Sequence, residues 1–174
     1  MPNGEPLSNR LLDCKKEFQK REVGMKIEEL KDIIAFAIEK EQEAVDFYNL
    51  LSGRVKVKPI TEELRKIAAV EESHRDRLKK MDVSGYFQKV VNPVQNLKIA
   101  DYLVDKEPSP DMKWQDLLQI AMRRELASMH LYTDLAKLIT DSPSRQLFEN
   151  LAAEEGAHKL FFEKLWDEEV LTDN

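Results

Sequence analysis

The sequence predicts an all-α protein, a four-helix bundle made of two helical hairpins. Four long stretches carry apolar residues three or four positions apart, the spacing that places them on one face of a helix. The second pair of stretches repeats the first at an offset of 84 residues, so that Tyr48 corresponds to Tyr132 and Leu51 to Leu135. Because a hairpin of amphipathic helices cannot bury its own apolar stripe, the two halves must pack together.

The composition is consistent with one soluble helical domain of 174 residues. Charged residues make up 34% of the chain, as expected for solvated outer faces, and the net charge of −6 offers no basic patch for nucleic acid. No apolar run approaches the roughly 20 residues of a membrane span, and residues 1–24 lack the apolar centre of a signal peptide. One cysteine excludes an internal disulfide. We therefore expect a cytoplasmic protein without nucleic-acid or membrane partners.

The first half of the chain is predicted to form an N-terminal extension and one helical hairpin. Residues 1–24 are expected to be an added extension, with a short surface helix over about 9–22 and disorder before it. The first bundle helix is expected over about 26–52, with Gly53 as its stop signal. The second follows Pro59, takes Thr61 as N-cap, and ends near residue 81.

The second half begins after a long connection. Between about residues 82 and 112 the periodicity breaks, apart from a possible short helix over about 96–104, and the length predicts a crossover along the bundle. The third helix is expected over about 113–140, and the fourth starts with Ser142 as N-cap and Pro143 at its first position. The bundle should occupy residues 25–170, followed by a polar tail at 171–174.

Each predicted apolar stripe contains a glutamate near its middle, and two stripes add a histidine one turn later. Burying unpaired carboxylates is costly, so these side chains need partners or metal ions. One Glu from each of two helices plus Glu-x-x-His from each of the others is the ligand set of di-iron and di-manganese carboxylate bundles. The predicted metal ligands are Glu41, Glu71, His74, Glu125, Glu155 and His158.

Charge supports a pair of metal ions at this position. Four carboxylates and two neutral imidazoles are balanced by two divalent cations, with Glu71 and Glu155 as bridges and Glu41 and Glu125 as terminal ligands. Oxygen and imidazole donors suit iron or manganese, and zinc could also bind. The alternative is that the glutamates lie at stripe edges and form salt bridges with Lys40, Arg75 or Arg124.

Two tyrosines lie on the same helix faces as the first and third glutamates. Tyr48 and Tyr132 are expected to hydrogen-bond the glutamate of the opposite half, or else to be plain core aromatics. His130 lies about 140° around its helix from Glu125, so we expect it at the surface rather than at the metals.

Four segments resemble the rubrerythrin branch of the ferritin-like superfamily: EQEAVDFY (41–48), EESH (71–74), ELASMHLY (125–132) and EGAH (155–158). The resemblance covers about residues 25–166. It implies a ferritin-like bundle with a di-iron centre that reacts with peroxide or dioxygen, often in a homodimer. Rubrerythrins usually add a four-cysteine rubredoxin domain, whereas this chain has only Cys14, so the electron donor is expected to be a separate protein. Many also carry a further glutamate where this chain has Ser128, so the site is closer to the symmetric ferritin-like type.

The function expected from these observations is a di-iron oxidoreductase acting on hydrogen peroxide or dioxygen, in oxidative-stress defence or iron handling. One alternative is an iron-binding or delivery protein with little turnover. Another is a substrate oxygenase, which requires a pocket beside the metals; the small residues Ala44 and Ser128, one turn from the ligands, leave room for one. A third is a scaffold that binds no metal.

Overall fold

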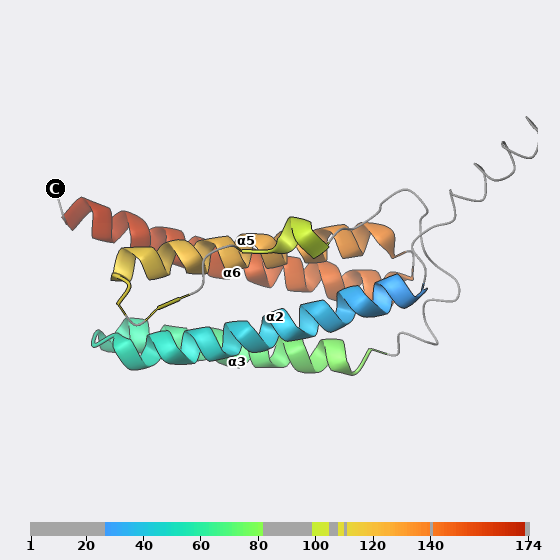
Figure 1. Cartoon of the computed structure of the whole chain (residues 1–174), viewed down its shortest axis with the longest axis horizontal. Coiled ribbons are helices and arrows are strands. Elements are labelled where there is room, and N and C mark those ends of the chain that lie inside the picture. The colour runs from blue at the N-terminus through green and yellow to red at the C-terminus, as the bar shows by residue number, and fades with distance from the viewer. Residues whose placement is uncertain (1–26, 82–98, 105–107, 110, 140, 173–174) are drawn as a thin grey trace, which may run out of the picture.

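Four long helices form the protein in the computed structural model, which describes residues 27–81, 99–104, 108–109, 111–139 and 141–172. Helices α2 (Ile27–Arg54) and α3 (Lys58–Lys79) form one hairpin, and α5 (Trp114–Leu138) and α6 (Ser142–Thr172) form the other. The two hairpins lie side by side with their helices roughly aligned (Figure 1). The predicted four-helix bundle is confirmed.

The connection between the hairpins spans the bundle. Helices α3 and α5 run in the same direction, so the chain leaves α3 at one end and enters α5 at the other (Figure 1). The described part includes a 3-10 helix, η2 (Ile99–Tyr102), which packs against α5 within the predicted short helix of 96–104. The predicted surface helix of 9–22, like the whole extension of residues 1–24, lies outside the described residues.

The α2–α3 turn corrects two boundary predictions. Gly53 does not end its helix: α2 continues to Arg54, and the Val55 amide still donates to the Leu51 carbonyl at 3.1 Å. Helix α3 begins at Lys58 with Pro59 in its first turn, where a missing N–H costs nothing. Thr61 is therefore not the N-cap. Its hydroxyl instead donates to the Val55 carbonyl at 2.9 Å, which closes the turn.

The start and end of α6 also differ from prediction. Ser142 already belongs to the helix, and the Asp141 carboxylate accepts the Ser144 amide at 3.1 Å. Asp141 is therefore the capping residue, because its longer carboxylate reaches the third amide of the first turn. At the other end α6 continues to Thr172, two residues into the predicted polar tail.

The apolar core is divided into two clusters along the bundle. Helix α2 contributes Leu30 to Ala37 to one cluster and Phe47 to Leu51 to the other, with Glu41 between them. The same division occurs on α5, on either side of Glu125. Glu41 and Glu125 therefore lie between two packed apolar clusters, on the face of each helix that points into the bundle.

Candidate metal centre

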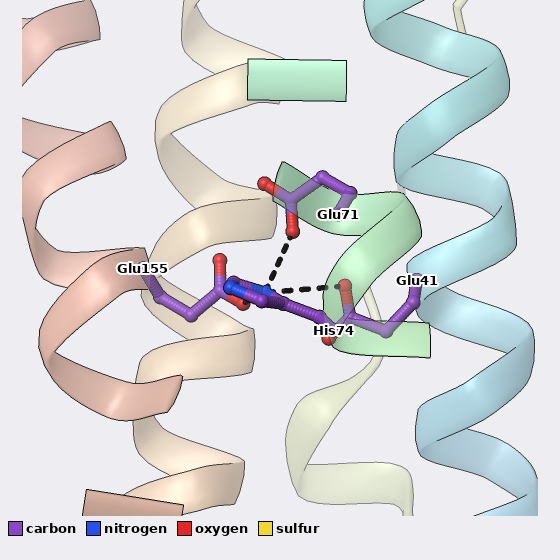
Figure 2. Close-up of side chains that lie close together, drawn as sticks. All are labelled: Glu41, Glu71, His74 and Glu155. Atoms are coloured by element: carbon purple, nitrogen blue, oxygen red, sulfur yellow. Dashed lines mark hydrogen bonds and ion pairs between the residues drawn. The ribbon is translucent and has the colours of Figure 1, made fainter. Parts of the chain in front are cut away.

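All six side chains predicted to bind metal converge on one point inside the bundle. Helices α2 and α5 supply one glutamate each, and α3 and α6 supply a glutamate and a histidine three residues apart, which a helix places on one face. The four carboxylates are no more than 2% exposed, and His74 is fully buried. Figure 2 shows Glu41, Glu71, His74 and Glu155 pointing toward one another from α2, α3 and α6.

The first group of donor atoms surrounds the His74 imidazole. Its Nδ1 lies 2.9 Å from Glu155 Oε1 and 3.0 Å from Glu71 Oε2, and 3.7 Å from Glu41 Oε2. These four residues offer ligand atoms that all lie within 4.8 Å of one another. The spacing is small enough for one cation to contact all four.

The second group repeats this arrangement around His158. Its Nδ1 lies 2.8 Å from Glu71 Oε1, 3.4 Å from Glu125 Oε2 and 3.8 Å from Glu155 Oε2. Glu71 and Glu155 belong to both groups, whereas Glu41 and Glu125 belong to one each. The two imidazole rings are stacked with centroids 6.2 Å apart. The structure therefore contains two adjacent cation-sized groups with two shared carboxylates.

Each tyrosine on the bundle axis makes the hydrogen bond expected from the sequence. The Tyr48 hydroxyl of α2 donates to Glu125 of α5, and the Tyr132 hydroxyl of α5 donates to Glu41 of α2. Both rings are buried, so these bonds also satisfy hydroxyls that have lost water. Each half of the repeat thus orients the carboxylate of the other.

Electrostatics show how strongly the carboxylates depend on nearby positive charge. Burial alone would lower the pKa of each histidine, but hydrogen bonding to neighbouring carboxylates raises the pKa of His74 and of His158 to about 12. Burial, followed by repulsion from Glu155, raises the pKa of Glu41 and Glu125 well above 4.5. Without metal the cluster therefore holds protons on its imidazoles and outer carboxyls. Metal ions must displace these protons on binding.

The unpaired polar atoms in the site test whether it suits a metal. Among the described residues, six buried side-chain atoms lack a hydrogen bond of acceptable geometry, and four of the six are in the cluster: both Glu71 oxygens, Glu125 Oε2 and His158 Nδ1, which lies 2.8 Å from Glu71 Oε1. Such atoms are costly in a protein interior unless another partner satisfies them. These four cluster atoms belong to the two cation-sized groups, so the residues present fit divalent metal ions.

The salt-bridge alternative for the four glutamates is wrong. Lys40 pairs with Glu43 at 2.8 Å, and Arg75 pairs with Glu72 and Asp76 at 3.0 and 2.9 Å. The four cluster glutamates are instead buried, at no more than 2% exposure, rather than at the edges of their stripes. His130 is exposed on α5, as the sequence predicts.

One functional residue, Glu154, was not predicted from the sequence. Its Oε2 lies 2.5 Å from His74 Nε2 and accepts a hydrogen bond from Arg77 at 2.6 Å. Burial alone would raise the pKa of Glu154, but Arg77 and His74 lower it, so the carboxylate is ionised. It therefore holds a proton on Nε2 and leaves Nδ1 facing the cluster. The 84-residue repeat conceals this residue, because Val70 stands at the equivalent position.

Glu154→Ala is expected to weaken one of the two metal sites by about 10- to 100-fold, because His74 loses the carboxylate that orients its ring. Titration of the metal-free protein with Co(II), followed by absorption, should change from two similar binding steps to one strong and one weak step. Glu149→Ala is the matched control, since Glu149 is exposed on the same helix. Equal affinities in both variants would remove the orienting role.

A cavity of about 190 Å³ opens beside the cluster. All four cluster glutamates line it, together with Ala44 and Ser128. These small residues follow Glu41 and Glu125 by one helical turn, as expected from the sequence for a pocket at the metals. The connection segment contributes the Tyr102 to Val104 part of the wall.

Comparison with known proteins is consistent with this geometry. The family model described as Rubrerythrin matches residues 32–166, a range that includes all six cluster residues. A candidate ferritin-like diiron-carboxylate protein of Thermotoga maritima has a similar structure, with a TM-score of 0.69 and 22% identity over 84% of this chain and 97% of that one. A hypothetical protein of Pyrococcus furiosus gives a TM-score of 0.62 and 22% identity over 83% of this chain and 95% of that one. No curated protein is significantly similar in sequence.

Within the described residues, no helix is both long and apolar enough to cross a membrane.

Proposed function

Because this chain belongs to the rubrerythrin family, we propose that it is a non-haem di-iron oxidoreductase that reduces hydrogen peroxide or dioxygen. One observation carries the proposal: six donor residues, five of them buried and His158 partly buried, form two adjacent cation-sized groups that contain unpaired polar atoms. Glu41 and His74 would hold one ion, and Glu125 and His158 the other. Glu71 and Glu155, which belong to both groups, would bridge them.

The residues of this chain have defined tasks in such a reaction. When bound, a ferrous pair would supply the two electrons that, together with two protons from the solvent, reduce one peroxide to two water molecules, and it would orient the oxidant. Tyr48 and Tyr132 hold the outer carboxylates, and Glu154 keeps the proton of His74 on Nε2. The apolar clusters shield the carboxylates from water along the bundle axis, and the cavity leaves one side of them accessible to a small oxidant.

Electrons for repeated turnover must come from a reductant. The 174 residues contain one cysteine, too few for a four-cysteine rubredoxin iron site. We propose that a separate electron-donor protein supplies these electrons, and that the chain assembles into a homodimer or larger homo-oligomer.

Peroxide consumption by the iron-loaded protein tests the proposal. Protein loaded anaerobically with Fe(II) should consume hydrogen peroxide repeatedly in the presence of an added reductant, measured with a peroxide electrode. Consumption of about one peroxide per metal pair, with no further turnover, would instead indicate an iron-binding protein. The Zn(II)-loaded protein is the control, because zinc has no redox chemistry. If iron-loaded and zinc-loaded protein behave alike, the proposed function is wrong.

A second candidate is favoured by the cavity. A substrate oxygenase of the same bundle type needs space for an organic molecule next to the metals, and the small side chains of Ala44 and Ser128 border a cavity at this position. Addition of a substrate would then increase dioxygen consumption by the reduced iron-loaded protein, whereas a peroxide reductase would show no such dependence.

A further inference from the structure

The cluster carboxylates are too deeply buried for a hydrated metal ion to reach them in the closed bundle. All four are no more than 2% exposed, which leaves access at most to molecules near the size of water. A divalent cation in water carries a shell of bound water molecules, so it is larger than a single water molecule. Loading the centre of the folded protein therefore requires an opening in the bundle that serves as an entry path.

The cavity beside the cluster indicates which part of the bundle can open. Among the described residues that line it, only Tyr102, Leu103 and Val104 lie outside the four long helices. Moving a long helix would disrupt its packing against the other helix of its hairpin along the whole interface. A short connecting segment can detach locally at a much lower cost in free energy. We call residues 100–104, which end the crossover helix η2 and border the cavity, the strap.

Tyr102 attaches the strap to helix α5. Its hydroxyl donates to Asp134 Oδ2 at 3.0 Å, and η2 lies alongside α5 (Figure 1). The ring is 7% exposed and belongs to the same apolar cluster as Ala37 of α2 and Leu131 of α5. Burial, and then the bond to Asp134, raises the pKa of Tyr102 to about 13, so the hydroxyl keeps its proton and remains a donor. Leu103, the next residue, is 53% exposed, so Tyr102 is the anchor of this part of the strap.

We propose that metal ions enter and leave the centre between α2 and α5 when the strap detaches, and that the Tyr102–Asp134 hydrogen bond is the latch that sets how often it does so. Detachment uncovers the cavity that all four cluster glutamates line. Entry and release use the same open state, so the latch slows both by the same factor and leaves the affinity unchanged. The proposal rests on the metal centre of the proposed function and involves no redox step.

The kinetics of zinc exchange test this proposal. Tyr102→Phe removes only the hydroxyl, and Asp134→Ala removes its acceptor. Each should increase the rates of zinc uptake and zinc release about tenfold, with the Kd for zinc unchanged. Stopped-flow absorption with a chromophoric zinc chelator follows release from the Zn(II)-loaded protein and uptake by the metal-free protein. The double variant should be no faster than the faster single variant, because both substitutions break the same bond.

Lys137→Ala is the matched control. Lys137 pairs with Asp134 Oδ1 at 2.7 Å, so its removal leaves the bond from Tyr102 to Oδ2 in place and should leave both rates unchanged. Faster release without faster uptake, and hence weaker binding, would show that Tyr102 supports the shape of the site and would overturn the entry route. Unchanged rates in both Tyr102→Phe and Asp134→Ala would also overturn it.

Hydrogen exchange followed by mass spectrometry distinguishes local opening from general loosening of the bundle. In Tyr102→Phe the amides of the strap should exchange about tenfold faster, while those of α3 and α6 exchange as in the original chain. Faster exchange throughout α3 and α6 would show that the bundle as a whole is destabilised, which would overturn opening at the strap.

The same measurements separate this proposal from the proposed function. If zinc exchange responds as expected but the iron form consumes no peroxide, the entry route stands and the peroxide reaction falls. If the protein takes up no zinc, the metal centre is wrong and the entry route is overturned with it.

Discussion

Glu71→Ala and Glu155→Ala are each expected to reduce the metal content of the purified protein from about two divalent ions per chain to fewer than one. Both residues belong to both cation-sized groups, so each substitution removes a donor from two sites at once. Glu41→Ala or Glu125→Ala removes a donor from one group only, and should leave about one ion per chain. Elemental analysis after loading and desalting measures the difference.

The control for this loss is Glu72→Ala. Glu72 neighbours Glu71 on α3 but faces outward, where it pairs with Arg75 at 3.0 Å, so its removal should leave metal content unchanged. Loss of metal could also follow from unfolding, which circular dichroism of each metal-free variant would detect. Two ions per chain in folded Glu71→Ala and Glu155→Ala would refute the assignment of bridging ligands.

Metal loading is expected to raise the thermal unfolding midpoint of the protein by about 10–20 °C. In the metal-free protein, burial and repulsion from Glu155 raise the pKa of Glu41 and Glu125, which means that close packing of these carboxylates opposes folding. A cation that binds only the native state at 100 times its Kd contributes about 2.7 kcal/mol per site. Two sites give about 5 kcal/mol, and about 1 kcal/mol shifts the midpoint of a domain of this size by about 2–4 °C.

Differential scanning calorimetry with Fe(II) under anaerobic conditions, or with Zn(II), measures this shift. The same metals added to Glu71→Ala should raise the midpoint only slightly, because the shared donor is missing, while Glu72→Ala should respond like the original chain. A midpoint independent of metal in the original chain would mean that the buried cluster is satisfied by its own protons. The proposal that the cluster binds two divalent cations would then be contradicted.

The inward direction of the six cluster residues could be predicted because it depends on angles within single helices. Glu71 and His74 share a face whatever packs against α3, and the 84-residue repeat predicts the same pair on α6. The tyrosine bonds followed from the same reasoning, since Tyr48 and Glu41 lie on one face and the bundle brings Glu125 opposite. Helix boundaries were less predictable. Asp141, rather than Ser142, caps α6 because a side chain one residue earlier reaches the same amide.

The sequence alone therefore determined the all-α bundle, its two equivalent halves and the six donors, since periodicity and repetition are properties of the chain itself. Tertiary structure alone decided that Glu154, which accepts a hydrogen bond from Arg77, contacts the His74 imidazole, while Val70 stands at the position equivalent to Glu154 in the other half. It also decided that Ala44 and Ser128 border a real cavity. Contacts across helices depend on how far each helix is shifted and rotated against its neighbours, and no spacing within a single helix specifies that.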